Sequence, residues 1–203
     1  MNSRAVYSYG DEERAGAVLE PADRQRFERL ILPHQDAAFN LARWLLRSRA
    51  DAEDVTQDAL VRAFRFIAGF HGTDARTWLL QIVRNACYSW LEKNRRADLT
   101  TEFDETVHLQ AQGQATQSPE AAAVASNERE RLMRALESLP ARSREVLVLR
   151  ELEGCSYKEI ATITSIPIGT VMSTLARGRD GLKRLLRPRS GTDAGGKEVH
   201  RDV

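Results

Sequence analysis

The stretch "SYKEIATITSIPIGTVM", residues 156–172, has the pattern of two short helices joined at a tight corner. Ser156 is followed three residues later by Glu159. This is the spacing of a capping box, in which a hydroxyl and a carboxylate satisfy backbone N–H groups at the start of a helix. Thr164 and Ser165 follow as the corner. The stretch therefore predicts a helix-turn-helix.

The second helix of this pair, for which Pro167 suits the first turn, carries an apolar side and a compact polar side. The polar side recurs at helical spacing and consists of Thr170, Ser173, Thr174 and Arg177. Hydroxyls and a cation on one helix face suit the major groove of duplex DNA. From this segment alone, an ordinary helical hairpin with a solvated face remains the alternative.

Charge is unevenly distributed along the 203 residues, although the formal net charge is only +1. Residues 97–130 contain seven acids and one base, whereas residues 177–189 contain six bases and one acid. An acidic middle and a basic end indicate that the chain is divided into segments with different roles. The hydrophobic content of 42% and charged content of 29% suit a soluble globular protein.

The chain divides into five segments by composition. Residues 23–96 and 128–187 are rich in helix formers and predict two small all-α domains. Residues 97–127 are predicted to be an acidic, flexible linker, within which "SPEAAA" marks the start of a helix at Pro119. Residues 1–22 and 188–203 are expected to be flexible tails.

An acidic face is predicted within "DAEDVTQDALVRAFR", residues 51–65. On a helix, Asp51, Asp54 and Asp58 fall within an arc of about 60° beside an apolar stripe. That stripe consists of Val55, Ala59, Ala63, Phe66 and Phe70. The face is either a solvated surface or a docking site for a basic partner. No nucleophile, histidine or Gly-rich loop accompanies these acids, so we expect no covalent catalysis.

The next segment, residues 75–96, interleaves aromatic side chains with cations. Bases can stack on aromatic rings while phosphates meet positive charge, so this pattern suits single-stranded nucleic acid. The alternative is that Trp78 and Trp90 are core residues beside a solvated basic end.

Together these motifs resemble an extracytoplasmic-function sigma factor, from the two-domain group of bacterial initiation factors. Residues 51–65 are similar to sigma region 2.2, and "WLLQIVRNACYSWLEKNRR", residues 78–96, to regions 2.3 and 2.4. Residues 139–186, "LPARSREVLVLRELEGCSYKEIATITSIPIGTVMSTLARGRDGLKRLL", are similar to region 4. The resemblance covers roughly residues 23–96 and 128–187 and implies promoter-directed transcription initiation in a stress response.

The resemblance also implies roles for individual residues. A surface for the β and β′ subunits of core RNA polymerase would comprise Asp51, Asp54, Gln57, Asp58 and Arg62. A surface for the −10 element, including the loop "GFHGTDAR" that would capture a flipped base, would comprise His71, Asp74, Arg76, Trp78, Arg84, Asn85, Lys93, Arg95 and Arg96. A surface for the duplex −35 element would comprise Ser156, Lys158, Thr170, Ser173, Thr174, Arg177, Arg179 and Arg184.

The chain departs from the family pattern at four places. Family members often have a hydrophobic residue and a Gly at Thr164-Ser165, an aromatic residue at Ala75, an acid at Ser89 and a basic residue at Thr174. A left-handed Ser165 would be strained by about 1 kcal/mol. Ala75 changes the shape of the base pocket, and Thr174 changes affinity for the −35 element.

The resemblance implies two further features. An anti-sigma protein is the expected inhibitor. The acidic linker would pass near the polymerase cleft and mimic nucleic acid through Asp98, Glu102, Asp104 and Glu105. Unchanged abortive and productive initiation after neutralising these acids would contradict that mimicry.

Other classes of function are weighed beside the sigma factor. One is a helix-turn-helix regulator that binds duplex DNA without polymerase; another is an interaction module that sequesters other factors. The scattered histidines and the separate Cys87 and Cys155 favour neither a metal site nor a redox pair, so no cofactor is expected. No signal peptide or membrane-spanning run is found, so we expect no membrane insertion and a cytoplasmic location.

Overall fold

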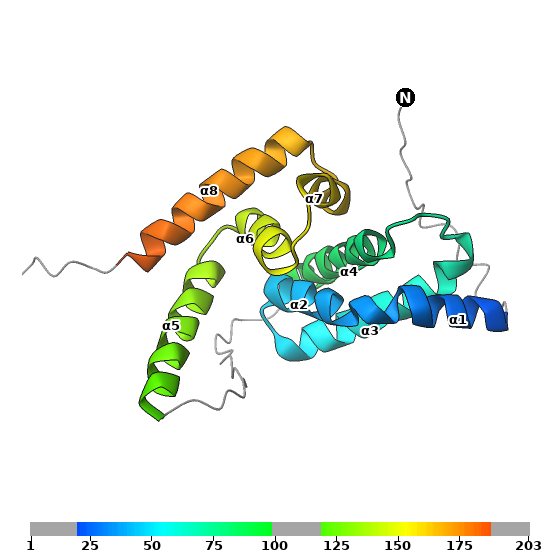
Figure 1. Ribbon diagram of the computed structural model, residues 1–203, viewed down its shortest axis with the longest axis horizontal. Helices are drawn as coiled ribbons and strands as arrows, with labels where there is room; N and C mark the ends of the chain where they lie inside the picture. Colours follow the sequence, from blue (N-terminus) through cyan, green and yellow to red (C-terminus); the bar gives the residue numbers. More distant parts are fainter. Residues whose placement is uncertain (1–19, 99–118, 188–203) are drawn as a thin grey trace, which may run out of the picture.

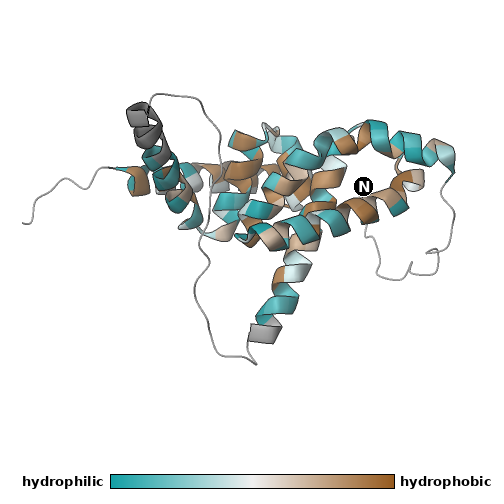
Figure 2. Ribbon diagram, turned by 90° about the horizontal axis from the view of Figure 1, so that it is seen from below, coloured by the Kyte–Doolittle hydropathy of each residue, from teal (hydrophilic) through white to brown (hydrophobic). Residues whose placement is uncertain are grey.

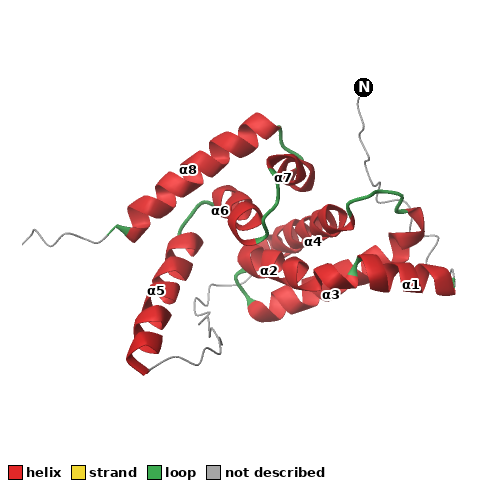
Figure 3. Cartoon of the chain, viewed as in Figure 1, coloured by secondary structure: helices red, strands yellow, loops and turns green. Residues whose placement is uncertain are grey.

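The computed structural model describes residues 20–98 and 119–187, and in these ranges every regular element is a helix (Figure 3). The all-α prediction is therefore confirmed. Most of the two predicted tails and residues 99–118 of the predicted linker lie outside the described residues. Residues 119–127, which were assigned to the linker, belong to a helix that starts at the predicted Pro119.

The N-terminal half is a bundle whose longest helices are amphipathic (Figures 1 and 2). Its elements are α1 (Pro21–Leu30), η2 (Leu32–His34), α2 (Gln35–Leu46), α3 (Arg49–Phe66), η3 (Ile67–Gly69) and α4 (Ala75–Asp98). α2, α3 and α4 pack against one another. The predicted stripe on α3 is buried at Val55, Ala59 and Ala63, but Phe66 ends the helix and is 40% exposed.

The C-terminal half contains α5 (Pro119–Glu137), α6 (Ala141–Leu147), the π-helical turn η4 (Val148–Leu152), α7 (Tyr157–Thr164) and α8 (Ile168–Leu186). Pro140 separates α5 from α6. Gly154, at φ +66°, follows η4 and turns the chain toward α7. α8 packs against both α6 and α7.

The helix-turn-helix predicted at residues 156–172 is present. The Ser156 hydroxyl accepts a hydrogen bond from the Glu159 N–H at 3.2 Å, and the Glu159 carboxylate accepts one from the Ser156 N–H, which completes the capping box. Ser165 adopts the left-handed conformation, at φ 55° and ψ 36°, so the expected strain at the corner is real. Pro167 precedes the second helix as its N-cap instead of entering its first turn.

The bend between α7 and α8 is 101°, within the range of helix-turn-helix units. In the described ranges no single helix is long and apolar enough to cross a membrane, and α7 and α8 meet that criterion only as this bent pair.

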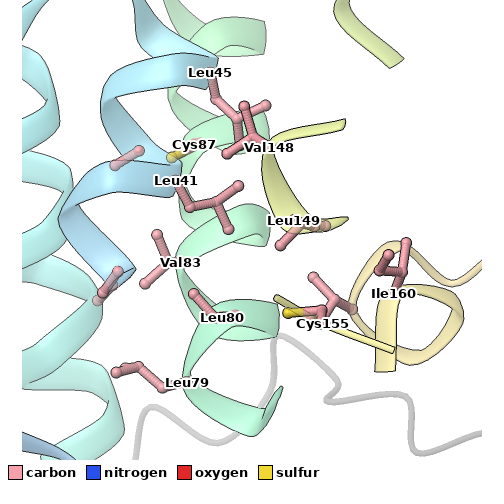
Figure 4. Packing of buried hydrophobic residues seen from close by; sticks show 14 of the residues in the cluster. Leu41, Leu45, Leu79, Leu80, Val83, Cys87, Val148, Leu149, Cys155 and Ile160 are labelled. Atoms are coloured by element: carbon pink, nitrogen blue, oxygen red, sulfur yellow. The ribbon is translucent and has the colours of Figure 1, made fainter. Parts of the chain in front are cut away.

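The two halves share one hydrophobic core. α6 and η4 pack against α2, and α7 packs against α4, so the C-terminal half lies directly on the N-terminal bundle (Figure 1). A close view shows leucines of α2 and α4 facing Val148, Leu149 and Cys155 (Figure 4). The sequence predicted two domains on a tether but gave no sign of this direct contact.

Candidate nucleic-acid and polymerase interfaces

The acidic face of α3 is open to solvent. Asp54 and Asp58 are exposed, and Asp51 is half-buried near the start of the helix. The Ser48 hydroxyl accepts a hydrogen bond from the Asp51 N–H at 3.3 Å and so fixes that start. Gln57 and Arg62 are exposed on the same helix, so all five residues predicted for polymerase binding lie on α3.

This face keeps its negative charge uncompensated. Within the described ranges, no ion pair is formed by Asp54, Asp58 or Arg62. By contrast, the neighbouring Glu53 is paired with Arg49 at 2.8 Å. Aligned carboxylates of this kind suit a basic partner surface.

The loop before α4 combines a helix cap with an aromatic pair. The Asp74 carboxylate accepts a hydrogen bond from the Thr77 N–H at 2.9 Å. Burial raises the pKa of Asp74, but the interactions with Thr77 and the charges of Arg76 and His34 outweigh burial and lower the pKa overall. Trp78 stacks on Phe70 with ring centroids 4.6 Å apart. His71 is exposed beside them. Asp74 thus has a structural role in starting α4, which the sequence did not predict.

Two arginines of α4, Arg76 in its first turn and Arg84 near its middle, are paired with acids from the C-terminal half. Arg84 donates to the Glu145 carboxylate at 2.6 Å, and Arg76 donates to the Glu153 carboxylate at 2.8 Å. Both arginines were predicted to meet DNA. In this structure their guanidinium groups are engaged instead.

The C-terminal part of α4 is more open. Asn85, Ser89, Glu92 and Arg95 line an open depression along the helix. Lys93 is exposed beside them. The side chain of Arg96 lies outside the described residues. This stretch of α4 therefore presents polar and cationic side chains that are not used in the contact between the two halves.

On α8, one predicted DNA-contact residue proves to be internal. Thr174 is 2% exposed and belongs to the inward stripe of Val171, Leu175 and Gly178. The expectation that Thr174 lies on the exposed polar face is wrong, because α8 packs against both α6 and α7 and its buried arc is correspondingly wide.

The outward stripe of α8 is instead centred on Met172, Ser173 and Arg177, with Thr170 at its margin. Met172 is 52% exposed, an unusual position for a methionine, and the sequence interpretation missed it. The spacing that links Thr170, Ser173 and Arg177 does not include Met172, because adjacent residues lie about 100° apart around a helix.

The remaining predicted −35 residues have mixed surroundings. Ser156 caps α7, and Lys158 is exposed in its first turn. Arg179 forms a fork with the Glu151 carboxylate at 3.0 and 2.6 Å, which raises the pKa of its guanidinium group. Arg184 is exposed near the end of α8.

The two cysteines are protonated thiols buried in the shared core. Burial, reinforced by the charge of Glu145, raises the pKa of Cys87 to about 12. Burial also raises the pKa of Cys155, whose sulfur accepts a hydrogen bond from Arg76 at 3.3 Å. Since the thiolate is the reactive species, both groups are poor nucleophiles in this arrangement. In the described parts of the chain no cluster of His, Cys, Asp and Glu is arranged to hold a metal ion.

Comparison with known protein families finds one match for the N-terminal half and another for the C-terminal half. The family described as sigma-70 region 2 matches residues 30–97, and that described as sigma-70, region 4 matches residues 129–182. The RNA polymerase sigma-H factor of Pseudomonas aeruginosa and the ECF RNA polymerase sigma-E factor of Escherichia coli are each 31% identical over 175 residues. Each alignment covers 84% of this chain and 91% of the relative.

Solved structures agree with these matches. The sigma factor RpoE from Bartonella quintana, solved with the anti-sigma factor NepR, superimposes with a TM-score of 0.66 and 29% identity, covering 79% of this chain and 96% of that one. CnrH, solved with the cytosolic domain of CnrY, gives a TM-score of 0.54 and 27% identity, covering 80% and 88%.

A region 2 bundle followed by a region 4 helix-turn-helix defines the sigma-70 class of initiation factors. This chain belongs to the extracytoplasmic-function group of that class. It is a promoter-specific sigma factor of bacterial RNA polymerase.

Proposed function

We propose that the chain binds core RNA polymerase through the acidic face of α3, brings it to promoters and helps to open the −10 region. Residues 23–96 would act as region 2 and residues 128–187 as region 4. The observation that carries this proposal is the exposed, uncompensated acidic face of Asp54 and Asp58 in a chain that also has a helix-turn-helix. A regulator that acts without polymerase has no need of such a face.

Opening of the −10 element would be the task of α4 and the loop before it. A base must leave the duplex stack, which costs a few kcal/mol and is offset by a pocket and by phosphate contacts. The exposed His71 and the half-buried Trp78, whose ring is held by the buried Phe70, offer surfaces for the base. Asn85 and the cations of α4 offer partners for the strand.

Recognition of the −35 element would be the task of the outward stripe of α8. Ser173 and Arg177 can hydrogen-bond base edges or phosphates, and the exposed Met172 can contact the methyl group of a thymine. Lys158 and Arg184, at opposite ends of the unit, suit phosphate positioning.

Regulation would involve a protein inhibitor. RpoE and CnrH, which are similar to this chain over most of its length, are named in their solved structures together with an anti-sigma factor and with the cytosolic domain of CnrY. An anti-sigma partner for this chain follows by similarity. The protein would act in the cytoplasm, where core polymerase works.

Run-off transcription with purified core polymerase on a promoter library tests the proposal. A set of enriched templates that share −10 and −35 elements is expected only when the chain is added. If no template is enriched, yet the chain alone retains a duplex sequence from the same library, the protein is a helix-turn-helix regulator instead.

A further inference from the structure

The outward side of α8 carries a row of apolar side chains beside its polar ones. Ile168 and Met172 lie one helical turn apart and are 46% and 52% exposed, and Ala176, a further turn along, is also exposed. We call these residues the apolar row. It runs beside Ser173 and Arg177, so the surface proposed to enter the major groove is apolar along one edge and polar along the other.

The apolar row suits the apolar feature of the major groove. The C5-methyl group of thymine is the part of the base edges that an apolar side chain contacts there. Met172 has the longest side chain of the row, with an unbranched, flexible thioether. Its sulfur therefore lies in a surface whose contact with DNA depends on being apolar.

The other sulfur groups of the described residues are shielded. Cys87 is 0% and Cys155 is 1% exposed, and Met133 of α5 is half-buried. Burial also raises the pKa of both thiols, so the reactive thiolate is scarce. Across residues 20–98 and 119–187, Met172 is thus the one sulfur-containing side chain that is exposed to a dissolved oxidant.

Oxidation would change the chemistry of this side chain without breaking the chain. Hydrogen peroxide transfers one oxygen atom to a thioether: an S–O bond forms, the O–O bond breaks, the sulfur is oxidised to a sulfoxide and the peroxide leaves as water. The product is polar and chiral where the thioether was apolar. Its oxygen accepts hydrogen bonds and donates none.

The surroundings of Met172 offer little to a sulfoxide oxygen. Ile168 and Ala176, on either side of it in the apolar row, have no side-chain donor. The neighbouring Ser173 hydroxyl already donates to the Thr170 carbonyl at 3.1 Å, and the Arg177 Nε–H donates to the Ser173 carbonyl at 3.3 Å. Pressed against a thymine methyl group, the sulfoxide would lose its water without gaining a partner.

We propose that Met172 is an oxidation-sensitive site, at which conversion to the sulfoxide weakens recognition of the −35 element. The polymerase-binding face is left intact, because α3 contains no sulfur. Peroxide would then reduce promoter binding by the assembled holoenzyme without releasing the chain from polymerase. The change is reversible, since methionine sulfoxide reductases restore the thioether. The inference rests on the proposed function of α8 and names a chemical control of it.

The test treats the full chain alone with hydrogen peroxide, removes the peroxide with catalase and then adds core polymerase. Peptide mass spectrometry locates the added oxygen, which we expect first on Met172. Affinity of the holoenzyme for a promoter duplex enriched from the library should fall about tenfold, because an unpartnered polar group is left in the contact. Affinity of the treated chain for core polymerase should stay the same.

Two variants separate Met172 from other targets of the oxidant, each compared with its own untreated sample. Met172→Leu keeps an apolar side chain of similar volume but has no sulfur, so peroxide should leave its promoter affinity unchanged. Met133→Leu removes the half-buried methionine instead and should lose about tenfold, as the wild type does. Treated wild-type protein should regain its affinity after incubation with both methionine sulfoxide reductases.

Three results would overturn the inference. They are unchanged promoter affinity in wild-type protein that carries the sulfoxide at Met172, an equal loss of affinity in Met172→Leu, and oxidation of a cysteine or of Met133 ahead of Met172. Failure of the proposed function is a separate outcome, because the untreated chain would then give no promoter-specific transcription with core polymerase.

Discussion

The Arg84 guanidinium group donates a 2.6 Å hydrogen bond to Glu145, 61 positions further along the chain, and the carboxylate that accepts it is 1% exposed. This ion pair joins the N-terminal half to the C-terminal half through a short hydrogen bond that is enclosed from solvent. Burial, together with the charge of Glu145, raises the pKa of Tyr88 to about 12, so the Tyr88 hydroxyl remains a donor throughout the physiological range.

We predict strong energetic coupling between these two residues. In a double-mutant cycle of Arg84→Gln and Glu145→Gln, the coupling free energy should be about 1–3 kcal/mol, the upper range for contacting residues. Urea unfolding of the four proteins measures it. Strictly additive losses, within about 0.5 kcal/mol, would show that the pair contributes nothing beyond each residue alone.

Charge reversal on α3 should disable polymerase binding without unfolding the protein. With Asp54→Lys and Asp58→Lys combined, affinity for core polymerase should fall by more than about tenfold, because like charges then meet across the interface. The free energy of unfolding should change little, since both side chains are exposed. Glu53→Lys, on the same helix, is the control, and an equal loss there would argue against a specific surface.

Met172 should read a thymine methyl group in the −35 element. Replacing one thymidine of an enriched promoter by deoxyuridine removes only that methyl, which contributes about 0.8 kcal/mol when buried. Wild-type protein should bind the deoxyuridine duplex a few-fold more weakly, whereas Met172→Ala should bind both duplexes alike. Leu185→Ala, at the far end of α8 and 46% exposed, should still distinguish them. Equal binding of both duplexes by the wild type at every thymine would refute the contact.

Two glycines of α8 should respond oppositely to the same substitution. A Cβ at Gly178 would lie 3.0 Å from a methyl carbon of Leu147 and 3.4 Å from the Ser143 carbonyl oxygen, so Gly178→Ala should destabilise the fold by about 1–3 kcal/mol. A Cβ at Gly169 meets nothing within 4 Å, so Gly169→Ala should stabilise it by up to about 1 kcal/mol. Chemical denaturation measures both, and equal shifts would mean that α8 does not approach α6 so closely.

Local features were predictable from the sequence because their causes are local. The capping box of Ser156 and Glu159 depends on a spacing of three residues, and the acidic face of α3 depends on helical periodicity. The left-handed Ser165 was a conditional expectation, since a corner of this length requires such a residue.

The contact between the halves had no local cause. Glu145 and Glu153 look like any solvated glutamate in the sequence, and nothing near them indicates that Arg84 and Arg76 are their partners. Thr174 illustrates a related limit, because helical spacing places it beside both faces of α8. Only the packing of α8 on α6 and α7 decides that it is internal.

The core shared by α2, α4 and η4 is formed within a single chain, so any opening or closing of this contact is unimolecular. Dilution does not open it, and raising the protein concentration does not close it. A competitor for the α4 face must overcome the effective local concentration of the C-terminal half, which is on the order of millimolar for a half tethered by a short linker. A partner that binds both halves in their separated positions does not compete with this local concentration, because it stabilises the separated arrangement directly.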